Sequence, residues 1–259
     1  MKRVPENLFK KHLAKNTQQI GIWSSLAGNI SAEVIAPSAF DWVVIDMEHS
    51  PNDLASVLSQ LQVYEAYPIQ ALVRPSWNDP VIVKSLLDLG VQGLIFPMIQ
   101  TVAEAEQAVA ATRYPPHGIR GVAGSTRATR YGRVDNYADG CEKELVVVVQ
   151  LETKKALKNA EAIAAVDGVD AIFFGPADIA ADLGVVGQPQ SEKVWNLIDP
   201  IATSLIKNKV PIGTLVLDAK FATKLLRQGY QFVACGMDTD LLAKATDSLV
   251  SLVKEAVSD

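Results

Sequence analysis

Residues 145–152 read LVVVVQLE, a run of β-branched apolar residues that ends in a glutamine and a glutamate. β-Branched residues favour strands, and a run that is apolar on both faces is typical of a strand buried within a parallel sheet. Seven further runs of this kind occur along the chain, at 18–26, 42–47, 69–75, 93–99, 171–176, 210–217 and 232–237. The sequence therefore predicts eight parallel strands, which helices should cover.

The segments between these runs show the apolar spacing of helices. Helices are expected at 52–64, 79–89, 102–112, 154–166, 191–207, 218–228 and 240–257. Gly90 and Gly229 can end helices just before a new strand begins. Eight strand–helix units of about 30 residues each predict an α/β fold, a single (β/α)8 TIM barrel, with an open doubly wound sheet as the alternative.

Residues 1–259 are expected to form one domain, with a short helical extension over about 1–17. The stretch 113–140 is too long for an ordinary connection and is rich in glycine and arginine. We expect it to be functional or to lie between subunits.

Composition excludes several classes of protein. The chain has 49% hydrophobic residues and a net charge of −5, from 24 Lys+Arg against 29 Asp+Glu, so it lacks the basic footprint of a nucleic-acid binder. Cys141 and Cys235 show no metal-like spacing, which argues against structural zinc or a disulfide framework. No signal peptide and no apolar run long enough to span a membrane occurs, so we expect a cytoplasmic protein without a membrane partner.

Polar side chains end several of the apolar runs, where a TIM barrel carries its active site. They are Asp46, Glu48, His49, Arg74, Gln150 and Glu152, and the run at 171–176 leads through Gly175, Pro176 and Ala177 to Asp178. Each has a simpler alternative, because an aspartate can cap the next helix, Arg74 can form a surface ion pair and His49 can belong to a turn. Their convergence on one rim nevertheless predicts a catalytic site.

These residue types indicate one kind of chemistry. Glu152 and Asp178 offer two carboxylates, which suit Mg²⁺ or Mn²⁺ with positions left for water and substrate, although both could instead be helix caps. His49, close to Asp46 in sequence, can act as a general base, and Arg74 can donate hydrogen bonds to an oxyanion. Together they suggest proton abstraction next to a carbonyl, with the metal holding the enolate.

Missing motifs narrow the reaction further. The predicted strands and their ends, from 42–49 onward, contain no lysine, so a Schiff-base aldolase would lack its nucleophile. No GxGxxG or GxxxxGK[ST] motif occurs, and the last two strands end in GTLVLD and CGMDTD rather than in a glycine-rich anion nest. Dinucleotide, nucleoside triphosphate and phosphate sites are therefore disfavoured.

Five segments carry a resemblance to a known family: DWVVIDMEHSPND, ALVRP, RYPPHGIRGVAGSTRATRYGR, VVQLET and FFGPADIAADLG. The resemblance covers the chain from about residue 18 to its C-terminus. In order and spacing they resemble the HpcH/HpaI family of class II pyruvate-dependent aldolases. The resemblance implies a barrel, usually a hexamer built as a trimer of dimers, that reversibly cleaves a 4-hydroxy-2-oxo acid into pyruvate and an aldehyde with Mg²⁺, Mn²⁺ or Co²⁺. The alternatives are a carbon–carbon lyase of the phosphoenolpyruvate mutase or citryl-lyase type, and a non-catalytic barrel that binds a keto acid.

The resemblance also implies roles for single residues. Glu152 and Asp178 match metal ligands, His49 matches the catalytic base, and Arg74 matches the group that steadies the enolate. Asp88 matches a carboxylate that raises the basicity of the histidine, and Asp46 is a second group that could orient its ring.

Other positions match the substrate-binding part of the family's site. They are Gln150 and Ala177, the latter through its backbone N–H beside Gly175 and Pro176. Trp23, Leu215 and the loop 120–133 match positions that meet the aldehyde substituent. Within that loop Arg127 and Arg130 could pair with an acidic aldehyde, or could be solvated or contact another subunit.

Overall fold

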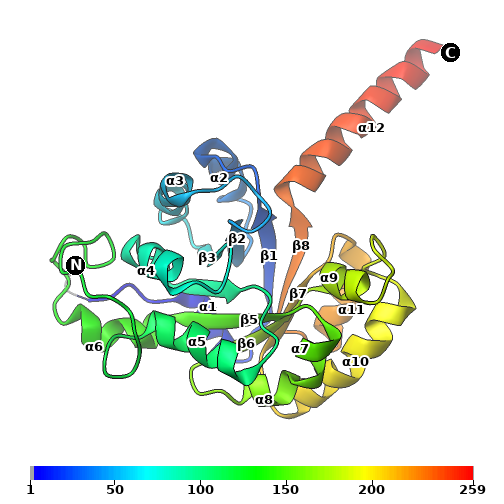
Figure 1. Ribbon diagram of the computed structural model, residues 1–259. Helices are drawn as coiled ribbons and strands as arrows, with labels where there is room; N and C mark the ends of the chain where they lie inside the picture. The colour runs from blue at the N-terminus through cyan, green and yellow to red at the C-terminus, as the bar shows by residue number, and fades with distance from the viewer. Residues whose placement is uncertain (1–2, 259) are drawn as a thin grey trace.

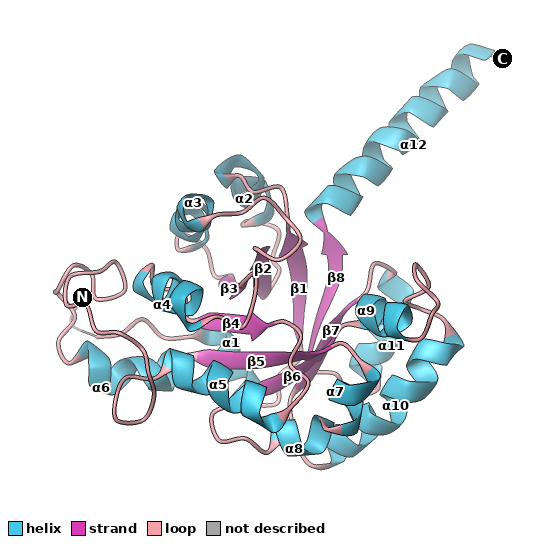
Figure 2. Cartoon of the chain, in the orientation of Figure 1, coloured by secondary structure: helices cyan, strands magenta, loops and turns pink. Residues whose placement is uncertain are grey.

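Eight parallel strands close on themselves in chain order in the computed structural model, which describes residues 3–258 (Figures 1 and 2). The strands are β1 (Gln19–Ser24), β2 (Trp42–Asp46), β3 (Gln70–Arg74), β4 (Gly93–Phe96), β5 (Val146–Leu151), β6 (Ala171–Phe174), β7 (Ile212–Leu215) and β8 (Phe232–Met237). Pairing of β8 with β1 completes the barrel. The predicted TIM barrel is confirmed, and the open doubly wound sheet is excluded.

Helices follow the strands around the outside. They are α1 (Leu8–Ala14), α2 (Asn29–Ile35), α3 (Leu54–Tyr64), α4 (Pro80–Asp88), α5 (Val102–Thr112), α6 (Tyr137–Cys141), α7 (Lys154–Lys158), α8 (Ala160–Ala164), α9 (Pro176–Asp182), α10 (Glu192–Lys207), α11 (Ala219–Arg227) and α12 (Asp238–Ser258), with a 3-10 turn at Glu142–Glu144. The helix predicted at 154–166 is divided at Asn159. Helices α2 and α9 were not predicted, because seven residues are too few to show a clear helical period.

Aromatic side chains fill the amino-terminal end of the barrel. Phe9 of α1 packs edge-on against Trp42 and Phe232, with ring centroids 5.6 and 5.2 Å apart. A Cβ atom at Gly213 would lie 2.3 Å from the Phe232 ring, so only glycine fits beside it. Because α1 and these rings close this end, the barrel can admit a ligand at the other end, where the strands finish.

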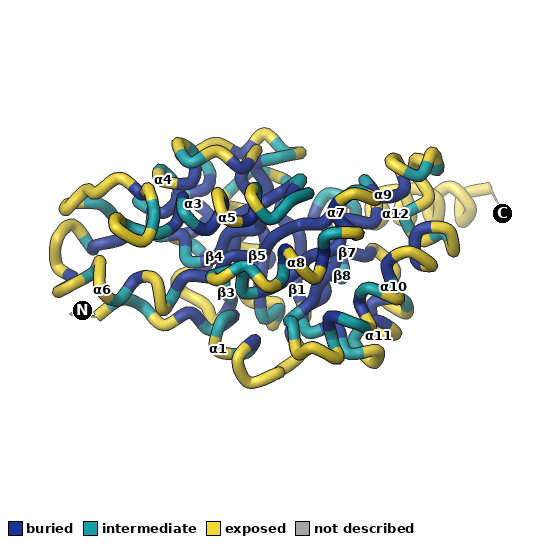
Figure 3. Tube along the Cα trace, turned by 60° about the horizontal axis from the view of Figure 1, so that its bottom comes forward, coloured by how far each residue is buried: buried dark blue, intermediate teal, exposed yellow. Residues whose placement is uncertain are grey.

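Helix α12 leaves the barrel and projects into solvent (Figure 1). Asp238, at its first turn, is its one buried residue, Thr239 and Asp240 are partly buried, and the helix is exposed from Leu241 onward (Figure 3). Within residues 3–258, no helix combines the length and the apolar character needed to cross a membrane.

Candidate active site

The carboxyl ends of the strands surround a pocket of about 660 Å³. Ten of the residues predicted for the site line it: Trp23, Asp46, His49, Arg74, Gln150, Gly175, Pro176, Ala177, Asp178 and Leu215. Glu152, 1% exposed, contacts Gln150 and lies beside Gly175. Glu48 contacts the lining residue Arg74, whereas Asp88 lies elsewhere.

Arg74, at the end of β3, is fixed by two carboxylates from the end of the neighbouring strand β2. Asp46 and Arg74 are register partners in β2 and β3, and the guanidinium donates to both oxygens of Asp46, from Nε at 2.8 Å and from Nη2 at 2.7 Å. Its third nitrogen, Nη1, lies 2.9 Å from Oε2 of Glu48. The guanidinium also lies over the Trp23 ring, 5.0 Å from its centroid. These contacts hold Arg74 in one orientation at the pocket wall.

The electrostatics of this cluster follow from burial and from the arginine. Burial alone would raise the pKa of Asp46, but the hydrogen bonds and charge of Arg74 hold it below its ordinary value. The pKa of Glu48 is raised, chiefly by burial and also by the nearby charges of Asp46 and Asp178. The charges of Arg74 and His49 lower this pKa, but by less. Burial alone would lower the pKa of Arg74, but the hydrogen bonds and charges of the nearby carboxylates raise it above its ordinary value. The guanidinium therefore stays charged.

Glu152 is as deeply buried as Asp46, each being 1% exposed. Its Oε1 accepts a hydrogen bond of 2.6 Å from Nε2 of Gln150, and its Oε2 accepts one of 2.6 Å from the N–H of Met98. Met98 has a left-handed backbone (φ 55°), a conformation costly for methionine, which the surrounding structure enforces at this contact. A Cβ at Gly175 would lie 2.7 Å from Cγ of Glu152, so the glycine leaves room for the carboxylate.

The raised pKa of Glu152 indicates that the pocket suits a cation. Burial, together with the neighbouring charges of Asp178 and Glu48, raises the pKa of Glu152 to about 8. A divalent ion would relieve this cost by pairing with the ionised carboxylates. Oxygen donors of this kind fit Mg²⁺ or Mn²⁺.

The donor set is small. Among residues 3–258, no three or more His, Cys, Asp or Glu side chains gather in an arrangement that would surround a metal ion. Glu152 and Asp178 would therefore supply two ligands and leave further positions to substrate and water, which is the usual habit of Mg²⁺ sites.

His49 lies at the mouth of the pocket with its side chain 65% exposed. Its ring faces Glu48, with Nε2 3.8 Å from Oε2. Asp46, suggested above as an orienting group, uses both carboxylate oxygens on Arg74 instead. Glu48 is thus the acid that lies between the candidate base and the candidate oxyanion donor.

Asp88 is not brought to His49 within one chain. It is the last residue of α4, which runs from the pocket end of the barrel back to the other end. There its Oδ1 lies 3.4 Å from Nη2 of Arg120, a buried side chain that also lies over the ring of Tyr114. Within the chain, Asp88 serves to anchor the long stretch 113–140.

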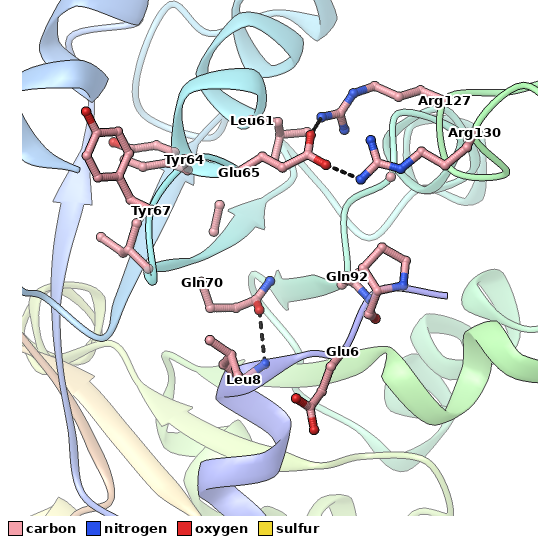
Figure 4. A pocket seen from close by; sticks show the side chains of 14 residues that line it. Glu6, Leu8, Leu61, Tyr64, Glu65, Tyr67, Gln70, Gln92, Arg127 and Arg130 are labelled. Atoms are coloured by element: carbon pink, nitrogen blue, oxygen red, sulfur yellow. Dashed lines mark hydrogen bonds and ion pairs between the residues drawn. The ribbon is translucent and has the colours of Figure 1, made fainter. Parts of the chain in front are cut away.

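Arg127 and Arg130 are not among the residues that line this pocket. Both bind the carboxylate of Glu65, and Arg127 donates to the carbonyl of Leu89 at 2.7 Å. Glu65 and Leu89 follow the carboxyl ends of α3 and α4. Glu65 and the two arginines line a separate cavity of about 220 Å³ that includes Gln70 at the start of β3 (Figure 4). The two arginines therefore do not meet an aldehyde bound in the same chain.

Sequence reasoning missed part of the pocket wall. The additional lining residues are Ser25, Ser50, Pro51, Phe173, Pro189, Gln190, Val216, Leu217, Met237 and Thr239. Residues at the carboxyl ends of barrel strands are expected to face the active site, so the lining residues at the ends of β1, β7 and β8 could have been predicted. Pro189 and Gln190 lie in the connection between α9 and α10 and carry no such signal.

A closed barrel whose strand ends gather several acids, an arginine and a histidine around one pocket has the form of an enzyme with its active site at that end. The comparisons with known proteins agree: residues 19–245 match the family described as HpcH/HpaI aldolase/citrate lyase. The chain belongs to this family and is a carbon–carbon lyase.

Individual relatives cover almost the whole chain. It is 48% identical over 249 residues to a pyruvate aldolase of Rhizobium etli, covering 96% of this chain and 98% of the relative. It is 45% identical over 247 residues to a 4-hydroxy-2-oxo-heptane-1,7-dioate aldolase of Escherichia coli, covering 95% and 94%. The crystal structure of an HpcH/HpaI aldolase/citrate lyase family protein of Burkholderia cenocepacia superposes with a TM-score of 0.92 at 35% identity, covering 96% and 99%.

Proposed function

We propose that the chain is a divalent-metal-dependent aldolase that reversibly cleaves a 4-hydroxy-2-oxo acid into pyruvate and an aldehyde. The observation that carries the proposal is the convergence of Glu152 and Asp178 with Arg74 and His49 around one pocket. The printed names of two relatives, a pyruvate aldolase and a 4-hydroxy-2-oxo-heptane-1,7-dioate aldolase, support pyruvate as one half of the product pair.

The protein's own groups divide the work. Arg74 directs its charge toward the oxygen of the keto acid and steadies the negative charge that forms there. Gln150 offers Oε1, which is buried with no donor from the described residues, as an acceptor for a substrate hydroxyl. Glu152 and Asp178 would hold Mg²⁺, Mn²⁺ or Co²⁺, which supplies Lewis acidity at the keto oxygen when bound.

His49 moves the proton. In the cleavage direction, His49 takes the proton of the C4 hydroxyl, and the C3–C4 bond breaks. The electron pair of that bond passes into the pyruvate half. A proton is then returned to C3, which completes pyruvate. His49 is suited to this exchange because its ring is exposed at the pocket mouth, with the raised-pKa carboxyl of Glu48 beside it.

Deuterium exchange tests the function without knowledge of the aldehyde. Pyruvate is incubated with the protein and Mg²⁺ in D₂O, and the methyl proton signal is followed by NMR. We expect the signal to fade only when metal is present, and to persist with EDTA, with His49→Ala and with Glu152→Gln. Persistence of the signal with wild-type protein under every metal tried would contradict the proposal and would turn attention to the citryl-lyase type of reaction.

We also propose that the chain works as a homo-oligomer, for which the family resemblance suggests a hexamer. Helix α12 supports this, because its apolar side chains, including Leu249 and Leu252, are more than half exposed. Ile20, which projects from the outer face of β1, is 43% exposed beside the strand that leads into α12. We propose that α12 of a second copy of the chain covers the outer face of β1 around Ile20.

A further inference from the structure

His49 reaches the pocket from a loop rather than from a strand. The loop runs from Asp46, the last residue of β2, to Asn52, two residues before α3 begins. The ring of His49 is 65% exposed and lies 3.8 Å from Glu48, which is too far for a hydrogen bond. Within the chain, the backbone of the loop 46–52 therefore sets where this ring lies.

The loop is closed by two side chains that bind one carbonyl oxygen. Nδ2 of Asn52 donates to the carbonyl of Asp46 at 2.7 Å, and the hydroxyl of Ser50 donates to the same oxygen. The second N–H of the Asn52 amide donates to Oγ of Ser50 at 2.9 Å. Both ends of the loop are thus joined, with Glu48 and His49 between them.

Asn52 is in turn held by helix α3. Its Oδ1 accepts hydrogen bonds from Nε2 of Gln60 at 2.7 Å and from the hydroxyl of Ser56 at 2.8 Å. Nε2 of Gln60 also donates to the carbonyl of Ser56 at 3.2 Å. Because the carbonyls of Asp46 and Ser56 can only accept, they fix which way both amides face. The Asn52 amide cannot turn over without losing its partners.

This hydrogen-bond chain lies inside the barrel wall. Oγ of Ser24, at the end of β1, donates to Oε1 of Gln60 at 3.1 Å. Ser24 and Gln60 are both 0% exposed, and Asn52 is 9% exposed. Neighbouring molecules in an assembly cannot reach Ser24 or Gln60, so the support of the loop belongs to the single chain.

We propose that Asn52, held by Gln60, is a positioning residue that fixes the loop 46–52 and thereby the place of His49 beside the bound keto acid. The proposal rests on the aldolase function proposed above. Neither Asn52 nor Gln60 lines the pocket, so both act through the loop rather than by touching the substrate. Proton transfer depends steeply on position, and a shift of about 1 Å can cost up to roughly a hundredfold in rate.

The deuterium exchange of pyruvate tests the proposal when it is measured at saturating Mg²⁺ over a range of pyruvate concentrations. We expect Asn52→Ala to lower kcat of exchange by roughly tenfold or more. KM for pyruvate should stay within about twofold, because Arg74, Gln150 and the metal ligands are unchanged. Loss of pyruvate binding with unchanged kcat would contradict a positioning role.

Asn78→Ala is the matched control. Asn78 is also 9% exposed, and its Nδ2 donates to a backbone carbonyl, that of Glu104, at 2.9 Å. This variant removes the same kind of buried hydrogen bond from the loop after β3, so we expect kcat and KM to stay near the wild-type values. An equal fall of kcat in Asn78→Ala would mean that any loosening of the barrel rim slows exchange, and would overturn the proposal.

Gln60→Met gives an independent variant that leaves Asn52 in place. Methionine is similar in length, and Oδ1 of Asn52 keeps Ser56 as a donor, so we expect a smaller fall of kcat, by roughly threefold. The double variant Asn52→Ala/Gln60→Met should be no slower than Asn52→Ala, because Gln60 acts through Asn52. Losses that multiply in the double variant would contradict this order of action.

The wild-type protein separates the two failures. Absence of exchange in wild type under every metal tried removes the proposed function itself. Normal exchange in wild type, with unchanged kcat in Asn52→Ala and in Gln60→Met, removes only the positioning role. Should Asn52→Ala not fold, as judged by circular dichroism, kcat of Gln60→Met against that of Asn78→Ala decides the matter.

Discussion

At the scale of single residues, the pocket depends on how buried charges are paired. Arg74 is 7% exposed and Asp46 is 1% exposed, so neither is solvated well enough to stand alone. Their two hydrogen bonds are parallel, the geometry that makes an arginine–carboxylate pair strong. The pair therefore fixes the orientation of Arg74 at the pocket wall. It also compensates each of the two buried charges with a partner of opposite sign.

We expect Asp46→Ala to destabilise the fold by about 3–5 kcal/mol, because it leaves the Arg74 charge buried with only Glu48 as partner. The ion pair between Asp240 and the exposed Lys244 is the control, and Lys244→Ala should cost less than about 1 kcal/mol. Urea unfolding of the two variants measures both values. Similar costs for the two pairs would mean that burial does not set the value of the Asp46–Arg74 contact.

Glu152 gives a prediction about pH. Its pKa of about 8 in the folded chain lies above the ordinary value of 4.5, so the folded state binds the proton more tightly than the unfolded state. The resulting stability is complete below pH 4.5 and is lost as pH rises through about 8. In metal-free protein, we expect the melting temperature of wild type to fall relative to that of Glu152→Gln across this range.

Mg²⁺ should reverse this loss in the wild-type protein alone. Binding requires the ionised carboxylate, so at pH 8 the ion should raise the melting temperature of wild type and leave Glu152→Gln unchanged. Equal responses of the two proteins to Mg²⁺ would argue that Glu152 is not a ligand.

At the scale of elements, the junction between β6 and α9 controls the space available to Glu152. The Cβ of an alanine at position 175 would meet Cγ of Glu152 at 2.7 Å and its Oε1 at 2.9 Å. We expect Gly175→Ala to weaken Mg²⁺ binding by roughly tenfold or more, because the carboxylate must move from its ligand position. Gly124→Ala is the matched control, since nothing lies within 4 Å of its added Cβ.

Calorimetric titration with Mg²⁺ measures both glycine variants, and circular dichroism checks that each is folded. Unchanged Mg²⁺ affinity in Gly175→Ala would show that the close packing around Glu152 is not needed for the ion.

The strand ends explain why most of the pocket could be predicted. Asp46, Arg74 and Gln150 each end a buried apolar run, and a parallel barrel brings all such ends to one rim. Asp88 differs because it lies at the end of a nine-residue helix, which at 1.5 Å per residue carries it about 13 Å from the rim. The direction of a helix after its strand thus decides which residues can share the pocket.

Two further features of the pocket could not be predicted from the local sequence pattern. Gln190 enters the pocket from a connection between two helices, and its place depends on how α9 and α10 pack rather than on any periodic pattern. The tight contact between Gly175 and Glu152 likewise depends on two strands meeting in space. Burial of side chains against distant parts of the chain cannot be read from short-range spacing.

At the scale of the whole molecule, the predicted helix 240–257 is present, but its direction was not predictable. An amphipathic helix can cover its own barrel or that of another chain, and α12 points away from its own (Figure 1). The apolar residues Leu242, Leu249 and Val253 recur at intervals of seven and four residues, so they form one stripe along the helix. An exposed stripe of this length is typical of an interface.

We expect wild-type protein to sediment well above the 27.9 kDa of one chain, because burial of this stripe would stabilise an assembly. Leu249→Arg places a charge at the centre of the stripe and should shift the protein toward smaller species. Ser251→Arg adds the same side chain on the opposite, polar face and should not. Both residues are exposed in the single chain, so neither substitution disturbs its core. Sedimentation velocity at several concentrations measures the outcome, and wild-type protein that sediments as a single chain would refute the role of α12.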